Sequence, residues 1–126
     1  MNRIVLAYHS REAFKVVIVI PQHPNGDVAG TPRPRIILHY QCMTINKGVN
    51  SMYSQLRDRL PGVNPSDYIE FFCLKSWGVM NEKVVSDQIY VHDKLLIVDD
   101  RVVVVGSANI NDRSMVGDRD SEVGRW

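Results

Sequence analysis

Four polar side chains stand near the end of the chain, and their types suit a site that handles phosphate. His92 and Lys94 are two residues apart, and Ser107 and Asn109 follow with the same spacing. A tetrahedral anion could be held by the Lys94 ammonium together with the amide and hydroxyl donors. His92 could attack the anion or transfer a proton. A lone His-x-Lys pair is more often two ordinary residues at the solvent-exposed end of a strand. The neighbouring sequence must therefore show whether the pair is functional.

Two apolar runs, residues 89–98 and 102–105, flank the polar break Asp99-Asp100-Arg101 and predict a β-hairpin, to which these four side chains are the polar exceptions. Both faces of each run are apolar, so we expect a central hairpin that is covered on both sides. Cross-strand partners share a face. A two-residue turn, either Asp99-Asp100 or Asp100-Arg101, would therefore place all four polar side chains on one face. A three-residue turn would break that argument.

The complete pattern is longer than one pair of residues. It resembles the HKD motif of the phospholipase D superfamily, which is H-x-K-x(4)-D followed by G-S-x-N. The matching residues are His92, Lys94 and Asp99, then a short β run, and then Gly106, Ser107 and Asn109. The sequence is also similar to the C-terminal HKD half of eukaryotic phosphatidylcholine-type phospholipase D. The segments that carry this similarity are YVHDKLLIVDD, GSANINDRSM and RDSE. The strong part of the resemblance covers residues 88–122, and the upstream segments fit the same half-domain more loosely.

The resemblance implies a two-step phosphodiester exchange, in which one histidine forms a phosphohistidine and a second protonates the leaving alcohol. The implied substrate is a phosphatidylcholine-like phospholipid, which gives phosphatidic acid and a free headgroup. No metal or other cofactor is implied, because lysine and asparagine pairs carry the phosphate charge.

The resemblance also implies roles for single residues. Glu122 matches the acid that partners the histidine, and such a carboxylate would fix the tautomer of His92. The likeness to the second motif favours an acid–base role for His92. Asp99 and Gly106 are structural positions, with Asp99 expected to bond local backbone at the turn.

The chain departs from the two-motif scheme because it holds a single HKD motif. None of His9, His23 and His39 is followed by lysine two residues later. We therefore expect negligible activity unless a second HKD half joins, from an absent N-terminal half or from a second copy of the chain. Two alternatives stay open. One is a superfamily phosphodiesterase acting on DNA or cardiolipin precursors, and the other is a non-catalytic fragment that binds phosphorylated headgroups.

Length and composition predict a single domain over residues 1–126, with 44% apolar residues and 15 basic against 14 acidic ones. This balance leaves no broad basic footprint for nucleic acid. Cys42 and Cys73 lack metal-ligand spacing and are interpreted as free thiols in a reducing compartment, with one disulfide as the alternative. No apolar run approaches a membrane span. We expect a cytoplasmic protein whose contact with the membrane surface is peripheral.

The fold class expected is α/β, a mixed β-sheet flanked by helices that forms one half-domain of the phospholipase D fold. The elements predicted from apolar periodicity are helices over 2–13 and 36–60 with a kink or break at Gly48, and strands over 14–20 and 68–74. A loop over 21–35, a loop or turn over 76–86, the hairpin and a short helix within 108–115 complete the prediction.

Several further residues have two possible roles. His23, Arg33 and Arg35 could border an anionic substrate, although a solvated loop is the simpler interpretation. Trp77 and Met80 could line an apolar cleft, with core packing as the safer choice for Trp77. The remaining assignments are structural: His39 on a helix side, and Arg113 paired with Asp112, Asp118 or Asp120.

Overall fold

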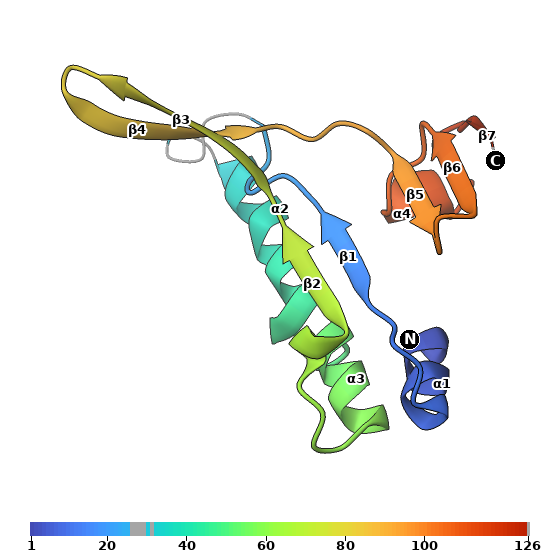
Figure 1. Ribbon diagram of the computed structural model, residues 1–126. Coiled ribbons are helices and arrows are strands. Elements are labelled where there is room, and N and C mark those ends of the chain that lie inside the picture. The colour runs from blue at the N-terminus through green and yellow to red at the C-terminus, as the bar shows by residue number, and fades with distance from the viewer. Residues whose placement is uncertain (26–29, 31, 126) are drawn as a thin grey trace. The chain divides into compact units, whose positions relative to one another are not determined.

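The computed structural model describes residues 1–25, 30 and 32–125, and the chain forms two compact units, Met1–Val91 and His92–Trp126 (Figure 1). The described residues form helices, one sheet of parallel strands and two sheets of antiparallel strands. The predicted α/β class is therefore confirmed. In the described residues the parallel and antiparallel pairs lie in separate small sheets.

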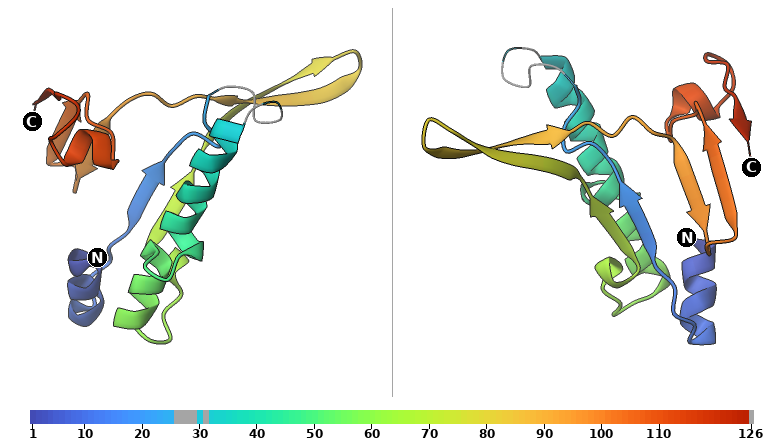
Figure 2. Two further views of the ribbon diagram at one scale, coloured as in Figure 1. Left: turned by 180° about the vertical axis from the view of Figure 1, so that it is seen from behind. Right: turned by 45° about the horizontal axis from the view of Figure 1, so that its top comes forward.

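The first unit places its helices beside a parallel pair of strands. β1 and β2 pair from Val16↔Ile69 to Val19↔Phe72, and the views in Figure 2 show α2 running along this pair. The core is a small apolar cluster that joins α1, α3 and β2. Its buried members are Ile4, Leu56, Leu60 and Ile69. The elements of this unit are α1 (Asn2–Ser10), β1 (Val16–Val19), α2 (Pro32–Cys42), a π-helical turn (Met43–Lys47), α3 (Met52–Arg59), a 3-10 turn (Pro65–Asp67), β2 (Ile69–Phe72), β3 (Leu74–Met80) and β4 (Lys83–Ile89).

The break at Gly48 is confirmed, because its backbone is extended, with φ of −72° and ψ of 150°, where the π-helical turn ends. A Cβ at this position would lie 2.6 Å from the Met43 carbonyl oxygen, so only glycine fits where the π-helical turn ends. α3 then starts afresh because Ser51, only 1% exposed, caps it. The Ser51 hydroxyl accepts a hydrogen bond from the Ser54 amide at 3.2 Å.

Other predicted boundaries in this unit need correction. The first helix ends at Ser10 because Arg11 adopts a left-handed conformation, with φ of 55°. The predicted loop 21–35 is too long, since α2 begins at Pro32. Proline is tolerated in a first helical turn, where its missing N–H would have had no intrahelical partner. Residues 26–29 and 31 of that loop lie outside the described residues.

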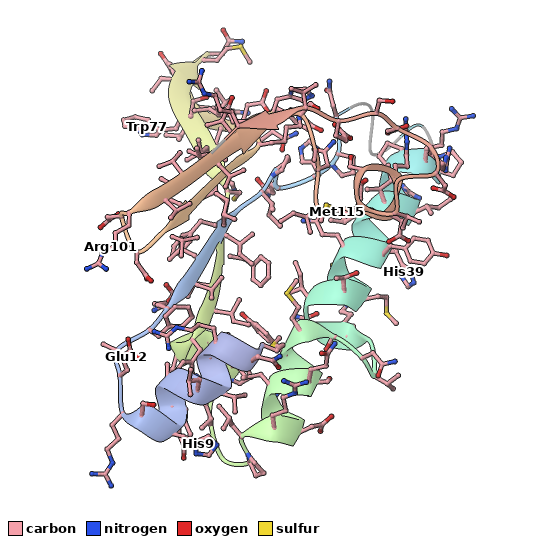
Figure 3. All side chains as sticks on the ribbon, turned by 90° about the vertical axis from the view of Figure 1, so that its right-hand side faces the viewer. His9, Glu12, His39, Trp77, Arg101 and Met115 are labelled. Carbon is pink, nitrogen blue, oxygen red and sulfur yellow. The ribbon has the colours of Figure 1, made fainter. Side chains whose placement is uncertain are left out.

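The predicted loop over 76–86 is wrong, because β3 and β4 form a regular antiparallel hairpin there. Its turn consists of Asn81 and Glu82, whose φ values are 50° and 61°. Core packing of Trp77 is also wrong, because its side chain is 79% exposed on this hairpin (Figure 3). The turn was missed because Asn-Glu lacks the glycine that usually marks two successive positive φ angles.

The second unit is an antiparallel sheet in the order β5-β6-β7 with one short helix. Both faces of its hairpin are open in this chain, with Leu96 58% and Ile97 55% exposed. The expectation that both faces are covered is therefore wrong here, because the helix of this unit has only four residues. The elements are β5 (Leu95–Val98), β6 (Val102–Gly106), α4 (Asp112–Met115) and β7 (Gly124–Arg125).

Two findings bear on the surroundings of the protein. Within the described ranges, no helix combines the length and the apolar character needed to cross a membrane. Cys42 and Cys73 are both free thiols, as the sequence predicts.

Candidate active site

The turn between β5 and β6 contains one residue more than a tight hairpin needs. Asp99 and Asp100 have φ of 50° and 54°, and the Arg101 amide donates to the Val98 carbonyl at 3.0 Å. These are the features of a type I′ turn. The strand ladder nevertheless starts at Val98↔Val102, so Arg101 is the extra residue of a bulge. The predicted two-residue turn is wrong, and simple alternation does not place the four polar side chains on one face.

His92 and Lys94 are also not inside a strand, which corrects the predicted strand over 89–98. β4 ends at Ile89 and β5 starts at Leu95, so both residues lie in the connecting segment. Lys94 is nevertheless fixed to the end of the hairpin, because its carbonyl accepts from the Gly106 amide at 3.1 Å. The two catalytic candidates thus approach β6 from the backbone immediately before β5.

The Lys94 ammonium turns back onto His92. Its Nζ atom donates to the His92 carbonyl at 2.5 Å and lies 3.3 Å from the imidazole Nδ1. An ammonium can only donate, so Nδ1 is the acceptor in this contact when the imidazole is neutral. An imidazolium donates from both ring nitrogens, so His92 must release this contact when it takes up a proton. The His92 imidazole is exposed to solvent.

Ser107 joins the other part of the motif to Glu122. Its hydroxyl donates to Glu122 Oε2 at 2.5 Å and accepts from the Val123 amide at 3.0 Å. Glycine makes this approach possible, because a Cβ on Gly106 would lie 2.7 Å from the Val123 carbonyl oxygen. The structural role predicted for Gly106 thus has a physical basis.

Glu122 is held in its charged form. The hydrogen bond from Ser107 and a second one from Ser114 lower the pKa of its carboxyl group below the ordinary value. The positive charge of Lys94 acts in the same direction, whereas burial and the charge of Asp120 oppose it. Lys94 therefore contacts His92 directly and acts on Glu122 through its charge.

The predicted site residues are thus partly brought together. Lys94 links to His92 by direct contact and to Glu122 through its charge, and Glu122 links to Ser107. Asn109 lies two residues beyond Ser107 and is exposed. The convergence of Asn109 with His92, and the pairing of Glu122 with His92, stay predictions.

Asp99 lies far from this cluster, in spite of its place in the motif. It follows the last residue of β5, which puts it roughly 16 Å along the strand from Lys94 at about 3.3 Å per residue. Its positive φ fits the expected role at the turn, because aspartate tolerates this conformation better than most residues.

The other candidates lie outside this cluster. His23 contacts Gln88, with Nδ1 3.1 Å from Nε2, and Arg33 lies exposed on α2 with Arg35. Of the three acids open to Arg113, the structure selects Asp120, at 3.0 Å. No group of three or more potential metal ligands occurs among the described residues.

One functional candidate escaped the sequence reasoning. The sequence reasoning gave Ser114 no role, although it lies in the motif, and its hydroxyl lowers the pKa of the Glu122 carboxyl group. Its amide is bonded to the side chain of Asn111, which caps α4 at 3.1 Å. The spacing of Asn111 and Ser114 is that of a helix cap, and this signal could have placed the hydroxyl near the start of a helical turn.

Comparison with known proteins identifies the family. The phospholipase D family profile matches residues 1–88 and 75–125. The chain is 43% identical over 123 residues to phospholipase D B of Dictyostelium discoideum, and 44% identical over 129 residues to phospholipase D zeta 1 of Arabidopsis thaliana. It is 42% identical over 126 residues to phospholipase D1 of Homo sapiens.

These alignments cover nearly all of this chain but a small part of each relative. They include 98%, 98% and 97% of the chain, and 10%, 12% and 12% of the respective relatives. The chain therefore spans about a tenth of the length of these curated relatives. Because the family profile matches both the upstream elements and the HKD segment, the chain belongs to the phospholipase D family.

Proposed function

We propose that this chain supplies one HKD half of a phosphodiesterase that hydrolyses phosphatidylcholine-like phospholipids to phosphatidic acid and a free headgroup. The observation that carries the proposal is the contact between the Lys94 ammonium and the His92 imidazole, 3.3 Å apart. A fixed positive charge beside a histidine can stabilise the negative charge that develops on a phosphoryl group. Membership of the phospholipase D family supports the reaction type.

The reaction proceeds in two displacements. In the first, a ring nitrogen of one histidine attacks phosphorus, the bond from phosphorus to the headgroup oxygen breaks, and a second imidazolium gives its proton to that oxygen. In the second, water attacks phosphorus, the phosphorus–nitrogen bond breaks, and the water proton passes to the second imidazole. Lys94 and Asn109 hold the phosphate oxygens in both steps.

His92 takes one of the two histidine roles, and we assign it the acid–base role. The second histidine comes from another HKD half, either in a longer chain or in a second copy of this one. A single imidazole cannot serve as nucleophile and as acid for the same phosphate in one displacement. Trapping a phosphorylated His92 would reverse this assignment.

Headgroup release from phosphatidylcholine vesicles, measured against protein concentration, tests the proposal. If two copies combine, the initial rate should rise more steeply than in proportion to concentration, and the monomer should be inactive. His92→Ala should lower the rate by about 10³-fold. His23→Ala is the matched control, since it removes a histidine outside the motif. Robust turnover by a proven monomer, or cleavage of DNA in preference to lipid, would contradict the proposal.

We also propose a cytoplasmic location with peripheral membrane contact, because the substrate lies in a bilayer. The exposed indole of Trp77 supports this, since tryptophan favours the boundary between lipid and water. Sedimentation with phosphatidylcholine vesicles should carry the chain into the pellet. A chain that stays in the supernatant at all vesicle concentrations would contradict this proposal.

A further inference from the structure

The Ser107 hydroxyl has only one proton, and the structure shows where that proton goes. It is donated to Glu122 Oε2 at 2.5 Å, while the oxygen accepts from the Val123 amide at 3.0 Å. A serine hydroxyl can donate once and accept twice. With its proton on Glu122, Ser107 cannot donate to a phosphate oxygen. The role predicted from the motif, a phosphate donor, therefore conflicts with the observed bonding.

The backbone fixes this arrangement on both sides. The Ser107 amide donates to the Val123 carbonyl at 2.9 Å, and the Val123 amide returns to the Ser107 hydroxyl. Gly106 pairs with Gly124 in the adjoining ladder, where neither residue has a side chain to hold the strands apart. Two segments 15 residues apart in the sequence are thereby locked around one hydroxyl and one carboxylate.

The surrounding charges agree with a positioning role. The Ser107 and Ser114 hydroxyls both lower the pKa of the Glu122 carboxyl group, and the Lys94 charge adds to this effect. Asp120 is the acid that opposes it. A carboxylate that accepts the Ser107 hydroxyl proton has less freedom to rotate, so its remaining lone pairs face a defined direction.

We propose that Ser107 is a positioning residue, which orients the Glu122 carboxylate by giving it its only hydroxyl proton, while Lys94 and Asn109 bind the phosphodiester without it. The proposal rests on the proposed function and deepens it, because it divides the motif into phosphate-binding and carboxylate-holding residues.

The direct test is a carbon-13 NMR titration of the Glu122 carboxyl carbon in the complete 126-residue chain. Ser107→Ala should shift the titration midpoint towards that of an ordinary glutamate, and Ser107→Thr, which keeps a hydroxyl, should restore it. Ser86→Ala is the matched control, since it removes a serine hydroxyl from β4. An unchanged midpoint in Ser107→Ala, with the amide spectrum of β5 and β6 preserved, would overturn the proposal.

The second test separates positioning from phosphate binding, with inorganic phosphate as the probe. Ser107→Ala should change the dissociation constant for phosphate less than twofold, whereas Lys94→Ala should weaken binding at least tenfold. Equal weakening by both substitutions would make Ser107 a phosphate ligand and overturn the proposal. If the unmodified chain binds no phosphate at concentrations where two copies have combined, the proposed function fails, and the carboxyl titration still decides the role of Ser107.

Discussion

The two hairpins of this protein have nearly the same turn but different registers. Asn81 and Glu82 in the first, and Asp99 and Asp100 in the second, all have φ between 50° and 61°. In the first, the ladder closes directly on the turn, at Met80↔Lys83. In the second, it closes at Val98↔Val102, with Arg101 left over.

This comparison shows that a turn does not by itself determine which side chains share a face. One unpaired residue shifts the partner assignments by one position, and each such shift moves a side chain to the other side of the sheet. In the second hairpin both faces are apolar, so burial does not select between registers. The facing pair Gly106 and Gly124 permits a close approach of β6 and β7. This approach constrains the pairing of β6 in a way that the apolar pattern does not.

The largest expected effect comes from deleting one residue in each turn. Deletion of Arg101 should be tolerated, because the bulge is lost while Val98 still pairs with Val102. Deletion of Glu82 leaves no room for a turn between Met80 and Lys83, so the first hairpin must slip in register and lose roughly 3 kcal/mol of stability. Cross-strand NOEs would identify the registers. A slipped register after Arg101 deletion would refute the bulge argument.

A second pair of variants compares one glycine in each hairpin. Gly106→Ala should lower the free energy of unfolding by about 2 kcal/mol, because the new Cβ would meet the Val123 carbonyl oxygen at 2.7 Å. Gly78→Ala should be neutral or stabilise by about 0.5 kcal/mol, because nothing lies within 4 Å of its Cβ position. Denaturant unfolding measures both, and equal costs would show that the close approach at Gly106 is unimportant.

Acid should loosen the second unit through Glu122. Its pKa is lowered in the folded state, so its stabilising contribution is complete above the unfolded value of about 4.3 and is lost as pH falls through the lower, folded value. The amide shifts of Ser107 and Val123 should report this loss. Glu122→Gln should remove the pH dependence, and the same acid response in that variant would assign it to another group.

The smallest effects concern strain in the two turns. Glu82→Gly should stabilise the first hairpin by about 1 kcal/mol, because the left-handed conformation at Glu82, with φ of 61°, is strained for glutamate and not for glycine. Asp100→Gly should gain less, because aspartate tolerates the left-handed region. Thermal unfolding of the two variants would rank them, and a larger gain at Asp100 would contradict this explanation.

The sequence predicted the parts of the fold that periodicity reveals. Apolar runs located β1, β2 and the turn at Asp99 to Arg101, and Gly48 marked the helix break. The bulge could not be predicted, because an unpaired Arg101 looks like any polar turn residue. β3 and β4 were missed because Gly78 and the Asn-Glu turn imitate a loop.

For the site, sequence reasoning gave the residues but not their division of labour. The types of His92 and Lys94 indicated phosphate chemistry, and the resemblance added Glu122. The contact between Ser107 and Glu122 could not be read from the sequence, because β7 has only two residues and shows no periodicity. A serine hydroxyl can also donate to either a phosphate or a carboxylate, so its residue type leaves the choice open.

The ladder between β6 and β7 consists of only two residue pairs, and this short length determines how often the ladder opens. Short ladders open by local fluctuation at far lower cost than global unfolding. Each opening would separate the Glu122 carboxylate from the Ser107 hydroxyl, so the hydrogen bond between them has a finite lifetime. Hydrogen–deuterium exchange at the Ser107 and Val123 amides would measure how often this ladder opens.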